Sequence, residues 1–396
     1  MIPEAQLAAL RARTPGLNAG AHFNHAGASL LPAAALAAIH AHLALESRVG
    51  PMQAALLAAP LREQLRRDAA TLLKADAEEI AFTPSGSSAL GQCFAALPAL
   101  RAGERILVGR QEWGGNLANY QRAAQRAGAR VELIPSRADG SVDAEALAAR
   151  INDGVRLISL TWLAANGGVI NDAAAVGRVA KAAGVAYFID AAQALGQLPV
   201  DVRALHCDVL AGSGRKHLRG PRGAALLYVR RGFLERLDPP WVDVFSAPYV
   251  EGAFALRADA RRFETSEAAI ALQLGLGAAI ALALSLGPQR IAAVVARKAQ
   301  ALRERLAGIP GLTLRDPDGA QGHGLVTFTL RGHAAFDLKA ALAQRKIYIG
   351  AHGVPFTPLD MRARGLEAVA RVSLSYLNTD EDVEALLRAL GALARA

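Results

Sequence analysis

The stretch YFIDAAQALGQ, Tyr187 to Gln197, indicates the fold class of this chain. It reads as an apolar strand that closes on Asp190 and leads into a short loop containing Gln193. Similar apolar runs alternate with alanine-rich helical patterns, which predicts an α/β domain with a largely parallel sheet and right-handed crossovers. Strands are expected at residues 80–83, 105–108, 130–134, 157–160, 186–190, 209–211 and 224–229, and helices at 87–97, 116–127, 144–150 and 172–183.

The alternation changes after Val229. A proline-rich loop follows, then an uncharged stretch over residues 268–287, and then a second α/β pattern that ends in an amphipathic helix at 380–394. Strands of this later part are expected near 324–330, 347–349 and 370–374. We therefore predict an N-terminal arm (1–20), a large domain (21–255), and a linking helix with a smaller C-terminal α/β domain (256–396).

Composition narrows the class of protein. The chain has 396 residues, of which 52% are hydrophobic, so it can bury a core in each of two domains. The net charge is +9, but the basic residues are spread through the sequence and aromatics are only 5%, which disfavours nucleic-acid binding. Two cysteines, Cys93 and Cys207, build neither a disulfide framework nor a metal-binding CxxC pair, so a reducing cytoplasm and no bound metal are expected.

The uncharged stretch over residues 268–287 could mimic a membrane span. Interior glycines, Gln273 and the lack of aromatic or basic anchors on both flanks favour a buried helix between the domains instead. The N-terminus carries Glu4 and has no unbroken apolar run, so it is not a secretory signal. No membrane attachment is expected.

Ligands of open α/β sheets bind beyond the carboxyl ends of the strands, so reactive side chains are expected in the loops that follow the strands. In FTPSGSSALGQ, the hydroxyls of Ser87 and Ser88 stand at a helix start, where they could bind a phosphate or simply cap the helix. In QEWGGNLANY, the indole of Trp113 could stack on a flat ring or pack in the core.

Two further loops carry charge. Asp190 closes a buried strand, where it could pair with a protonated ring nitrogen or cap a helix. Lys216 lies in SGRKHLRGPRG, Ser213 to Gly223, among Arg215, Arg219 and Arg222. Like charges lower the pKa of a lysine, which suits a Schiff-base nucleophile, although an isolated basic turn is usually only solvated. Together the four loops supply what a pyridoxal phosphate (PLP) site requires: a phosphate anchor, a ring stack, a partner for the pyridinium nitrogen and an amine.

The set resembles the class V aminotransferase family of fold type I PLP enzymes, which includes cysteine desulfurases, isopenicillin N epimerases and kynureninases. The resemblance runs from FNHAGAS at Phe23 to RVSLSYLNTDEDVEALL, and it rests on DxxQ, SGxK, GPxG and RxSxxxxNT in combination. It implies a homodimer, PLP as cofactor and an amino-acid substrate. It also implies roles for single residues. Lys216 is the Schiff-base lysine, Asp190 the partner of the pyridinium nitrogen, Gln193 a donor to the ring oxygen and Trp113 the residue that stacks on the ring. The phosphate contacts are Ser87, Ser88, Ser213 and Arg215, and Arg371 binds the substrate α-carboxylate.

The departures from the desulfurase pattern bear on the reaction. The segment GAHGVPFTPLDMRARGLEAVAR has no cysteine where desulfurases carry their nucleophile. A family asparagine near the cofactor meets Ala165, one place before Asn166, and the threonine that a partner subunit lends to the phosphate has only Ser266 as a candidate. The roles of His217, Arg219 and Arg222 stay open. The sequence GRKxLRGPRG and the aromatic Trp113 resemble carbon–sulfur lyases of ergothioneine biosynthesis, which cleave hercynylcysteine sulfoxide.

We therefore expect a β-lyase that acts on a cysteine S-conjugate or sulfoxide. The alternatives are an epimerase like isopenicillin N epimerase or a class V aminotransferase on the same cofactor, and, from a different class, a nonenzymatic phosphate or nucleic-acid binder.

Overall fold

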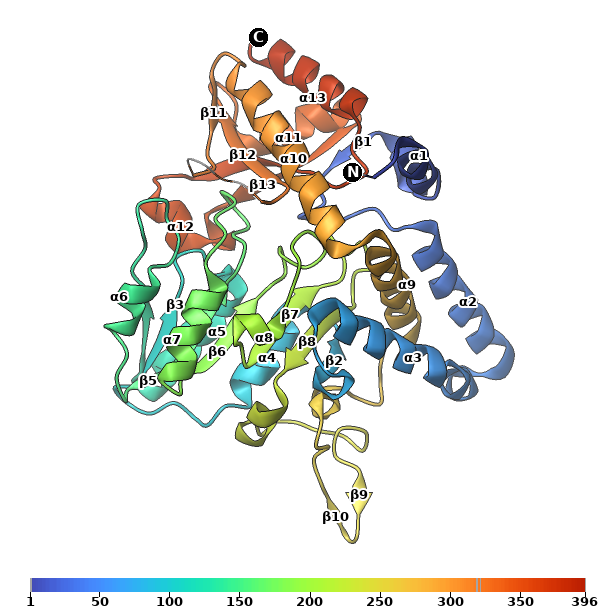
Figure 1. The fold of residues 1–396 in the computed structure, drawn as a ribbon, viewed down its shortest axis with the longest axis vertical. Coiled ribbons are helices and arrows are strands. Elements are labelled where there is room, and N and C mark those ends of the chain that lie inside the picture. Colours follow the sequence, from blue (N-terminus) through green and yellow to red (C-terminus); the bar gives the residue numbers. More distant parts are fainter. Residues whose placement is uncertain (1, 318–319, 321, 396) are drawn as a thin grey trace.

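A computed structural model describes residues 2–317, 320 and 322–395 of the chain (Figure 1). Within this part, the larger sheet has seven strands in the order β2-β8-β7-β6-β5-β3-β4. β8 runs antiparallel to both of its neighbours, and the other neighbouring strands are parallel. The strands are β2 (Ile80–Thr83), β3 (Arg105–Val108), β4 (Arg130–Leu133), β5 (Val155–Thr161), β6 (Ala186–Asp190), β7 (Val209–Ser213) and β8 (Ala225–Val229). The predicted α/β fold is confirmed, with a sheet that is mixed at one side.

The central strand β6 shows why this sheet lies inside the protein. All five of its residues are buried. Tyr187 and Ile189 pack into one hydrophobic cluster, and Ala186 and Phe188 pack into another on the opposite face. A strand that is apolar on both faces is typical of a sheet covered by helices on both sides. The helices that follow its strands are α4 (Gly86–Ala95), α5 (Gly114–Ala127), α6 (Ala144–Ala148), α7 (Ala173–Ala182) and α8 (Val202–Leu205).

The uncharged stretch forms α9 (Ile270–Leu286), which packs against two long helices, α2 (Ala33–Val49) and α3 (Pro51–Leu73). At Gly287, whose φ of 85° is in the region that favours glycine, the chain turns into α10 (Pro288–Ala307). Among the described residues, no single helix has the length and hydropathy to cross a membrane, and α9 and α10 satisfy those criteria only as a pair bent by 81°.

The smaller sheet has five strands in the order β1-β13-β14-β12-β11. A short hairpin of β9 (Tyr249–Val250) and β10 (Ala253–Phe254) lies at the opposite end of the molecule (Figure 1). β1 (Ala21–Phe23) comes from the N-terminal region and pairs in parallel with β13, although residues 21–23 were expected to belong to the large domain. The remaining elements are β11 (Leu312–Leu314), β12 (Leu325–Leu330), β13 (Ile347–Gly353), β14 (Ala368–Ser373), α1 (Glu4–Ala12), α11 (Ala335–Gln344), α12 (Pro358–Ala363) and α13 (Asp380–Leu393).

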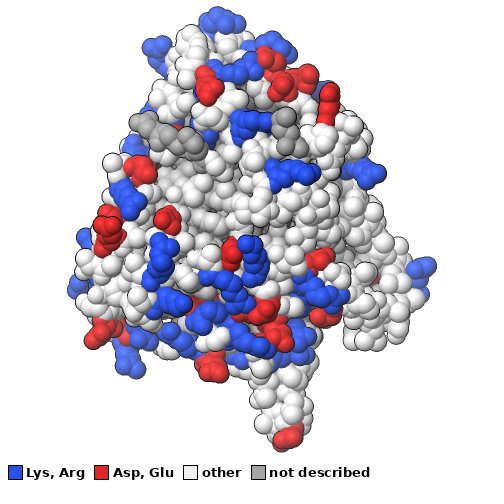
Figure 2. All heavy atoms as spheres, viewed as in Figure 1, with Lys and Arg blue, Asp and Glu red and all other residues white. Residues whose placement is uncertain are grey.

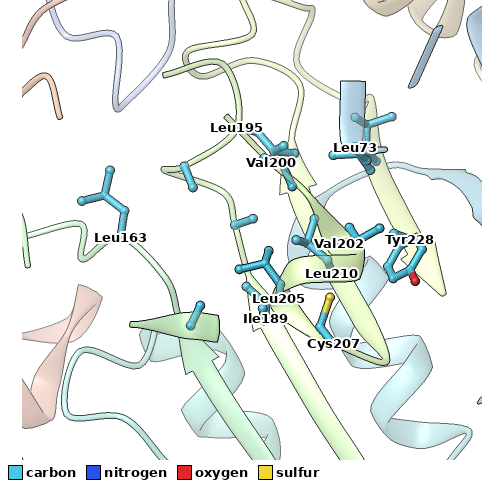
Figure 3. Packing of buried hydrophobic residues seen from close by; sticks show 14 of the residues in the cluster. Leu73, Leu163, Ile189, Leu195, Val200, Val202, Leu205, Cys207, Leu210 and Tyr228 are labelled. Carbon is cyan, nitrogen blue, oxygen red and sulfur yellow. The ribbon is translucent and has the colours of Figure 1, made fainter. Parts of the chain in front are cut away.

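Both cysteines belong to the core of the large domain. The sulfur of Cys207 lies among Leu205, Leu210 and Tyr228 (Figure 3), and Cys93 packs in the cluster on the other face of the sheet. Neither side chain is exposed. Burial raises the pKa of both thiols far above the usual range, so both stay protonated at neutral pH.

Candidate active site

A cavity opens where the strands of the large sheet end, facing the small domain. It combines side chains from the loops after β2, β3, β5, β6 and β7 with one from the segment before α12. It is lined by Gly86, Ser87, Gln111, Trp113, Thr161, Ala165, Asp190, Ala192, Gln193, Ser213, Arg215, Lys216 and Thr357. The structure thus brings together the predicted residues of all four loops, with the exception of Ser88.

Lys216 is buried in this cavity, with its Nζ 5.6 Å from the centre of the Trp113 ring. Gly196 allows this arrangement, because a Cβ there would come within 2.4 Å of the backbone of His217 and Leu218. Burial lowers the pKa of Lys216 to about 7. Asp190 opposes this shift, while Arg215 and Arg371 add to it. A large fraction of the amine is therefore uncharged at neutral pH and can act as a nucleophile.

The carboxylate of Asp190 is held by two donors. The backbone N–H of Ala192 donates to Oδ1 at 2.9 Å, and the side-chain amide of Asn116 donates to Oδ2 at 3.0 Å. Asp190 is 9% exposed, and it forms no salt bridge with any lysine, arginine or histidine in the described part of the chain. A buried carboxylate is stable beside a cation, so this one suits a protonated ring nitrogen of a ligand.

The two serines predicted to bind phosphate, at the start of α4, have different surroundings. Ser87 lines the cavity next to Gly86. Ser88 does not line it: its N–H donates to Ser85 Oγ at 3.0 Å, and its hydroxyl accepts from Gln92 at 3.0 Å. Its environment is that of a residue in a capped helix turn, since Ser85 is the N-cap. The anion-binding side of this helix start therefore consists of Gly86 and Ser87, with Ser213 and Arg215 opposite.

Arg371 lies on β14 of the small domain and is fully buried. Its Nη1 donates to the carbonyl oxygen of Ala165 at 2.8 Å, while Nε and Nη2 have no hydrogen-bond partner. Ala165 itself lines the cavity. A buried guanidinium with two free donors beside a lysine suits a carboxylate ligand, which can accept both hydrogen bonds.

Asn166 and Ser266 occupy different surroundings. The amide of Asn166 is buried and donates to Thr357 Oγ1 at 3.0 Å, while its own Oδ1 has no partner. Thr357 lines the cavity, so Asn166 reaches the site through this hydroxyl. The hydroxyl of Ser266 donates to Asp243 at 2.8 Å near the surface of the large domain, outside the cavity.

The basic stretch is mostly internal. Lys216, His217 and Arg219 are buried, Arg215 is half-buried, and only Arg222 is exposed. Arg219 has a φ of 62° and donates to Thr14, Tyr376 and the carbonyl oxygen of Leu30. On the face in Figure 2, aspartate and glutamate side chains lie among the lysine and arginine side chains. Because Arg222 is the one exposed basic residue of the stretch, the stretch offers no continuous basic surface to a polyanion.

The sequence reasoning missed Glu112, Asn116 and Thr357. Glu112 is fully buried next to Trp113, and Asn116 stands one helical turn later, between Glu112 and Asp190. An acidic residue in the loop after a buried strand, with an asparagine four residues later, was the available signal. No sequence signal pointed to Thr357, because it lies 141 residues beyond Lys216 and reaches the site with the small domain.

Comparison with known proteins agrees with this geometry. Residues 21–386 match the family described as aminotransferase class-V. The chain belongs to the class V aminotransferase family. A cysteine desulfurase from Salmonella gallinarum is 31% identical over 341 residues, which cover 84% of this chain and 82% of that protein. The apo structure of a cysteine desulfurase from Thermococcus onnurineus NA1 has a TM-score of 0.90 and 27% identity, with coverage of 100% of this chain and 98% of that one.

A carbon–sulfur lyase is also similar. The structure of the cystine C–S lyase C-DES with its reaction product, cysteine persulfide, has a TM-score of 0.85 and 25% identity, with coverage of 96% of this chain and 99% of that one. A lysine-to-alanine mutant of C-DES carries glycine covalently linked to PLP. PLP is the cofactor of this family. The site described above fits it: a buried lysine, an unpaired aspartate and a small-residue helix start offer an amine, a ring partner and a phosphate cradle.

Proposed function

We propose that this class V enzyme is a carbon–sulfur β-lyase that acts on a cysteine derivative whose sulfur is already bonded to a second group. The supporting observation is the position of its thiols. The chain has two cysteines, and both are fully buried in the core of the large domain. The small-domain segment that faces Trp113 presents His352 and Phe356, and the ring of Phe356 lies 5.6 Å from the indole. The chain therefore offers no accessible thiol to accept a sulfur atom.

In this proposal each residue has a defined task. Ser87, Ser213 and Arg215 would bind the cofactor phosphate, Trp113 would stack on its ring, Asp190 would pair with its ring nitrogen, and Gln193 would donate to its ring oxygen. When bound, PLP supplies an electron sink for the carbanion at the substrate α-carbon. Arg371 holds the substrate carboxylate through its two free donors, which places the α-hydrogen near Lys216.

The amine of Lys216 takes the α-proton as a general base. The carbon–sulfur bond then breaks, and the sulfur group leaves with the electron pair of that bond. Hydrolysis of the remaining three-carbon fragment yields pyruvate and ammonia. Because the leaving group carries the sulfur away, this route needs no thiol on the enzyme, which matches the burial of Cys93 and Cys207.

A substrate screen tests this proposal. PLP-loaded protein is incubated with cystine, with cysteine S-conjugates and with cysteine sulfoxides, and pyruvate and ammonia are measured. Equal amounts of pyruvate and ammonia are expected, and Lys216→Ala should abolish both. Release of alanine from free cysteine, tested alongside these compounds, would contradict the proposal in favour of desulfuration. Exchange of the α-hydrogen without pyruvate would favour an epimerase, and a requirement for a keto acid would favour an aminotransferase.

We further propose that the enzyme is a homodimer that uses the face of α2 and α3. Large apolar side chains are exposed there, with Met52 83%, Leu56 69% and Leu61 60% exposed. An apolar groove between α2, α3 and α9 adjoins them. Exposed apolar area of this kind marks an interaction surface. Sedimentation of the PLP-loaded protein should give about twice the chain mass, and Leu56→Glu with Leu61→Glu should return it to a monomer.

A further inference from the structure

Behind the proposed cofactor position lies a second buried carboxyl group, that of Glu112. It is fully buried, and it follows β3 directly before Trp113. The amide of Asn116 connects it to Asp190: the same nitrogen, Nδ2, donates to Glu112 Oε1 at 2.9 Å and to Asp190 Oδ2 at 3.0 Å. An amide nitrogen carries two hydrogens, so one asparagine serves both carboxyl groups at once.

The remaining contacts of Glu112 all come from neutral groups. The N–H of Trp113 lies 3.1 Å from Oε1 and the hydroxyl of Thr161 lies 3.4 Å from the same oxygen, while the hydroxyl of Ser159 lies 2.9 Å from Oε2. That hydroxyl also contacts Tyr120 Oη at 3.0 Å, where either oxygen can donate. The direction of the hydrogen bonds in the series Glu112, Ser159 and Tyr120 is therefore reversible. Ser159 can donate to an ionised Glu112 while it accepts from Tyr120, or it can accept a hydrogen bond from a protonated Oε2 while it donates to Tyr120.

The charged groups around Glu112 are few. Asp190 of β6 is the nearest ionised group, and Lys216 lies beyond it. Tyr120 of α5 stays protonated because burial raises its pKa well above its usual value, and Cys93 of α4 likewise stays a thiol. Arg110, two residues earlier, pairs with Asp360 instead. No lysine, arginine or histidine among the described residues forms a salt bridge with Glu112.

We infer that Glu112 is a proton-holding positioning residue: below neutral pH it keeps its own proton, and through the amide of Asn116 it fixes Asp190 as the single negative charge facing the cofactor ring. Two ionised carboxylates joined through one neutral amide would repel each other inside the protein, and no lysine, arginine or histidine of the described part of the chain forms a salt bridge with either of them. A protonated Glu112 removes this repulsion and still accepts the hydrogen bond that orients Asn116. This inference rests on the proposed placement of the cofactor ring beside Asp190.

The electrostatics support the geometry. Burial raises the pKa of Glu112 to about 7. The charge of Asp190 adds to this rise, while hydrogen bonds from Asn116, Ser159 and Trp113 oppose it. Glu112 therefore gives up its proton as the pH rises through neutrality. At that point a second negative charge lies near the ring nitrogen, and the electronic spectrum of the bound cofactor should respond.

Infrared spectroscopy of the cofactor-free protein gives a test that does not depend on catalysis. A protonated carboxyl group has a carbonyl stretch that disappears when it ionises. Between about pH 6 and about pH 8.5, either side of a pKa near 7, wild-type protein should lose such a band. Glu112→Gln, which keeps the acceptor oxygen, should lack the change. Glu79→Gln is the matched control, because Glu79 is equally buried but is paired with Arg203 at 2.8 Å.

A second measurement tests the connection to Asp190 in the PLP-loaded protein. The visible absorbance should show an inflection over the same pH range in the wild type and in Glu79→Gln. It should be absent from Glu112→Gln. In Asn116→Ala the infrared change should persist, because Glu112 is still present, and the absorbance inflection should be smaller, because Asp190 has lost the amide that connects it to Glu112. This variant also provides a result if Glu112→Gln does not fold.

The inference is overturned if wild-type protein shows no carboxyl band that is lost in this range, or if Glu112→Gln and the wild type give the same absorbance titration. Neither outcome bears on the lyase proposal, which fails instead if no sulfur substrate yields pyruvate. The two proposals can therefore fail separately.

Discussion

The ammonium nitrogen of Lys216 lies 5.6 Å from the centre of the Trp113 ring, although 103 residues separate them in the sequence. The lysine follows β7 and the tryptophan follows β3, on strands that are separated by β6 and β5 in the sheet. A flat ring placed against Trp113 would therefore meet the amine and, on the strand between them, Asp190. This relationship defines the site more than any single residue does.

The buried amine of Lys216 should make the stability of the cofactor-free protein depend on pH. Its pKa is lowered from 10.5 to about 7, so the folded state binds fewer protons than the unfolded state between these values. The free energy of unfolding should therefore rise with pH from about 7 to about 10.5, by at most about 5 kcal/mol from this group. Urea unfolding across this range should show the rise in wild type, and Lys216→Met should reduce it. An unchanged slope in the variant would show that the lysine is not buried as described.

Replacement of Arg371 should weaken substrate binding more than cofactor binding. In the proposed role of Arg371, the two free donors of its guanidinium would bind a carboxylate in a bidentate manner that a lysine cannot reproduce. In Arg371→Lys, loss of one charge-assisted hydrogen bond, about 2 kcal/mol, should raise the dissociation constant for an amino acid roughly 30-fold. Titration of the bound-cofactor spectrum with amino acid measures this constant. Amines that lack the carboxylate are the control, since the variant should bind them as the wild type does.

The two cysteines should be dispensable for chemistry but not for packing. In the double variant Cys93→Ala with Cys207→Ala, pyruvate release per folded molecule should stay within about twofold of wild type. Each replacement leaves a small void in a dense core and should cost about 1 kcal/mol of unfolding free energy. Activity assays and urea unfolding on the same samples separate the effects. Complete loss of product from a folded double variant would show that a thiol takes part in the reaction.

Arg219 should be a major stabilising residue even though it touches no carboxylate. It joins the turn after Lys216 to Thr14 and Leu30 of the N-terminal segment and to Tyr376 near the end of the small sheet. Arg219→Met would leave these buried oxygens unpaired and should cost about 3 kcal/mol. Thermal unfolding measures the loss. Arg222→Ala is the control, because this neighbouring arginine is exposed and its loss should cost less than about 0.5 kcal/mol. Equal effects of the two substitutions would contradict the assignment.

The sequence by itself determined the strand-and-loop order of the large domain. Most of its strands are largely apolar runs, because they are buried on both faces, and such runs can be read locally; the edge strand β4 is partly exposed. The same order placed Ser87, Trp113, Asp190 and Lys216 at or after the ends of β2, β3, β6 and β7, and the ends of strands that run in the same direction lie at one edge of the sheet. The long helix at 270–286 was also readable, since it carries no charge over its whole length.

Only the tertiary structure decided the rest. β1 joins the small sheet because residues 21–23 pair with β13, more than 300 positions away, and no local pattern encodes such a partner. Ser88 turned out to lie outside the cavity because Ser85 begins the helix, so the next turn points elsewhere. Arg371 and Thr357 reach the site from the small domain, and the link from Glu112 through Asn116 to Asp190 appears only after β3 and β6 are set on either side of β5. The sequence determines which residue types follow each strand and in what order. Which buried polar groups contact one another depends on the packing of helices and strands that lie far apart in the sequence.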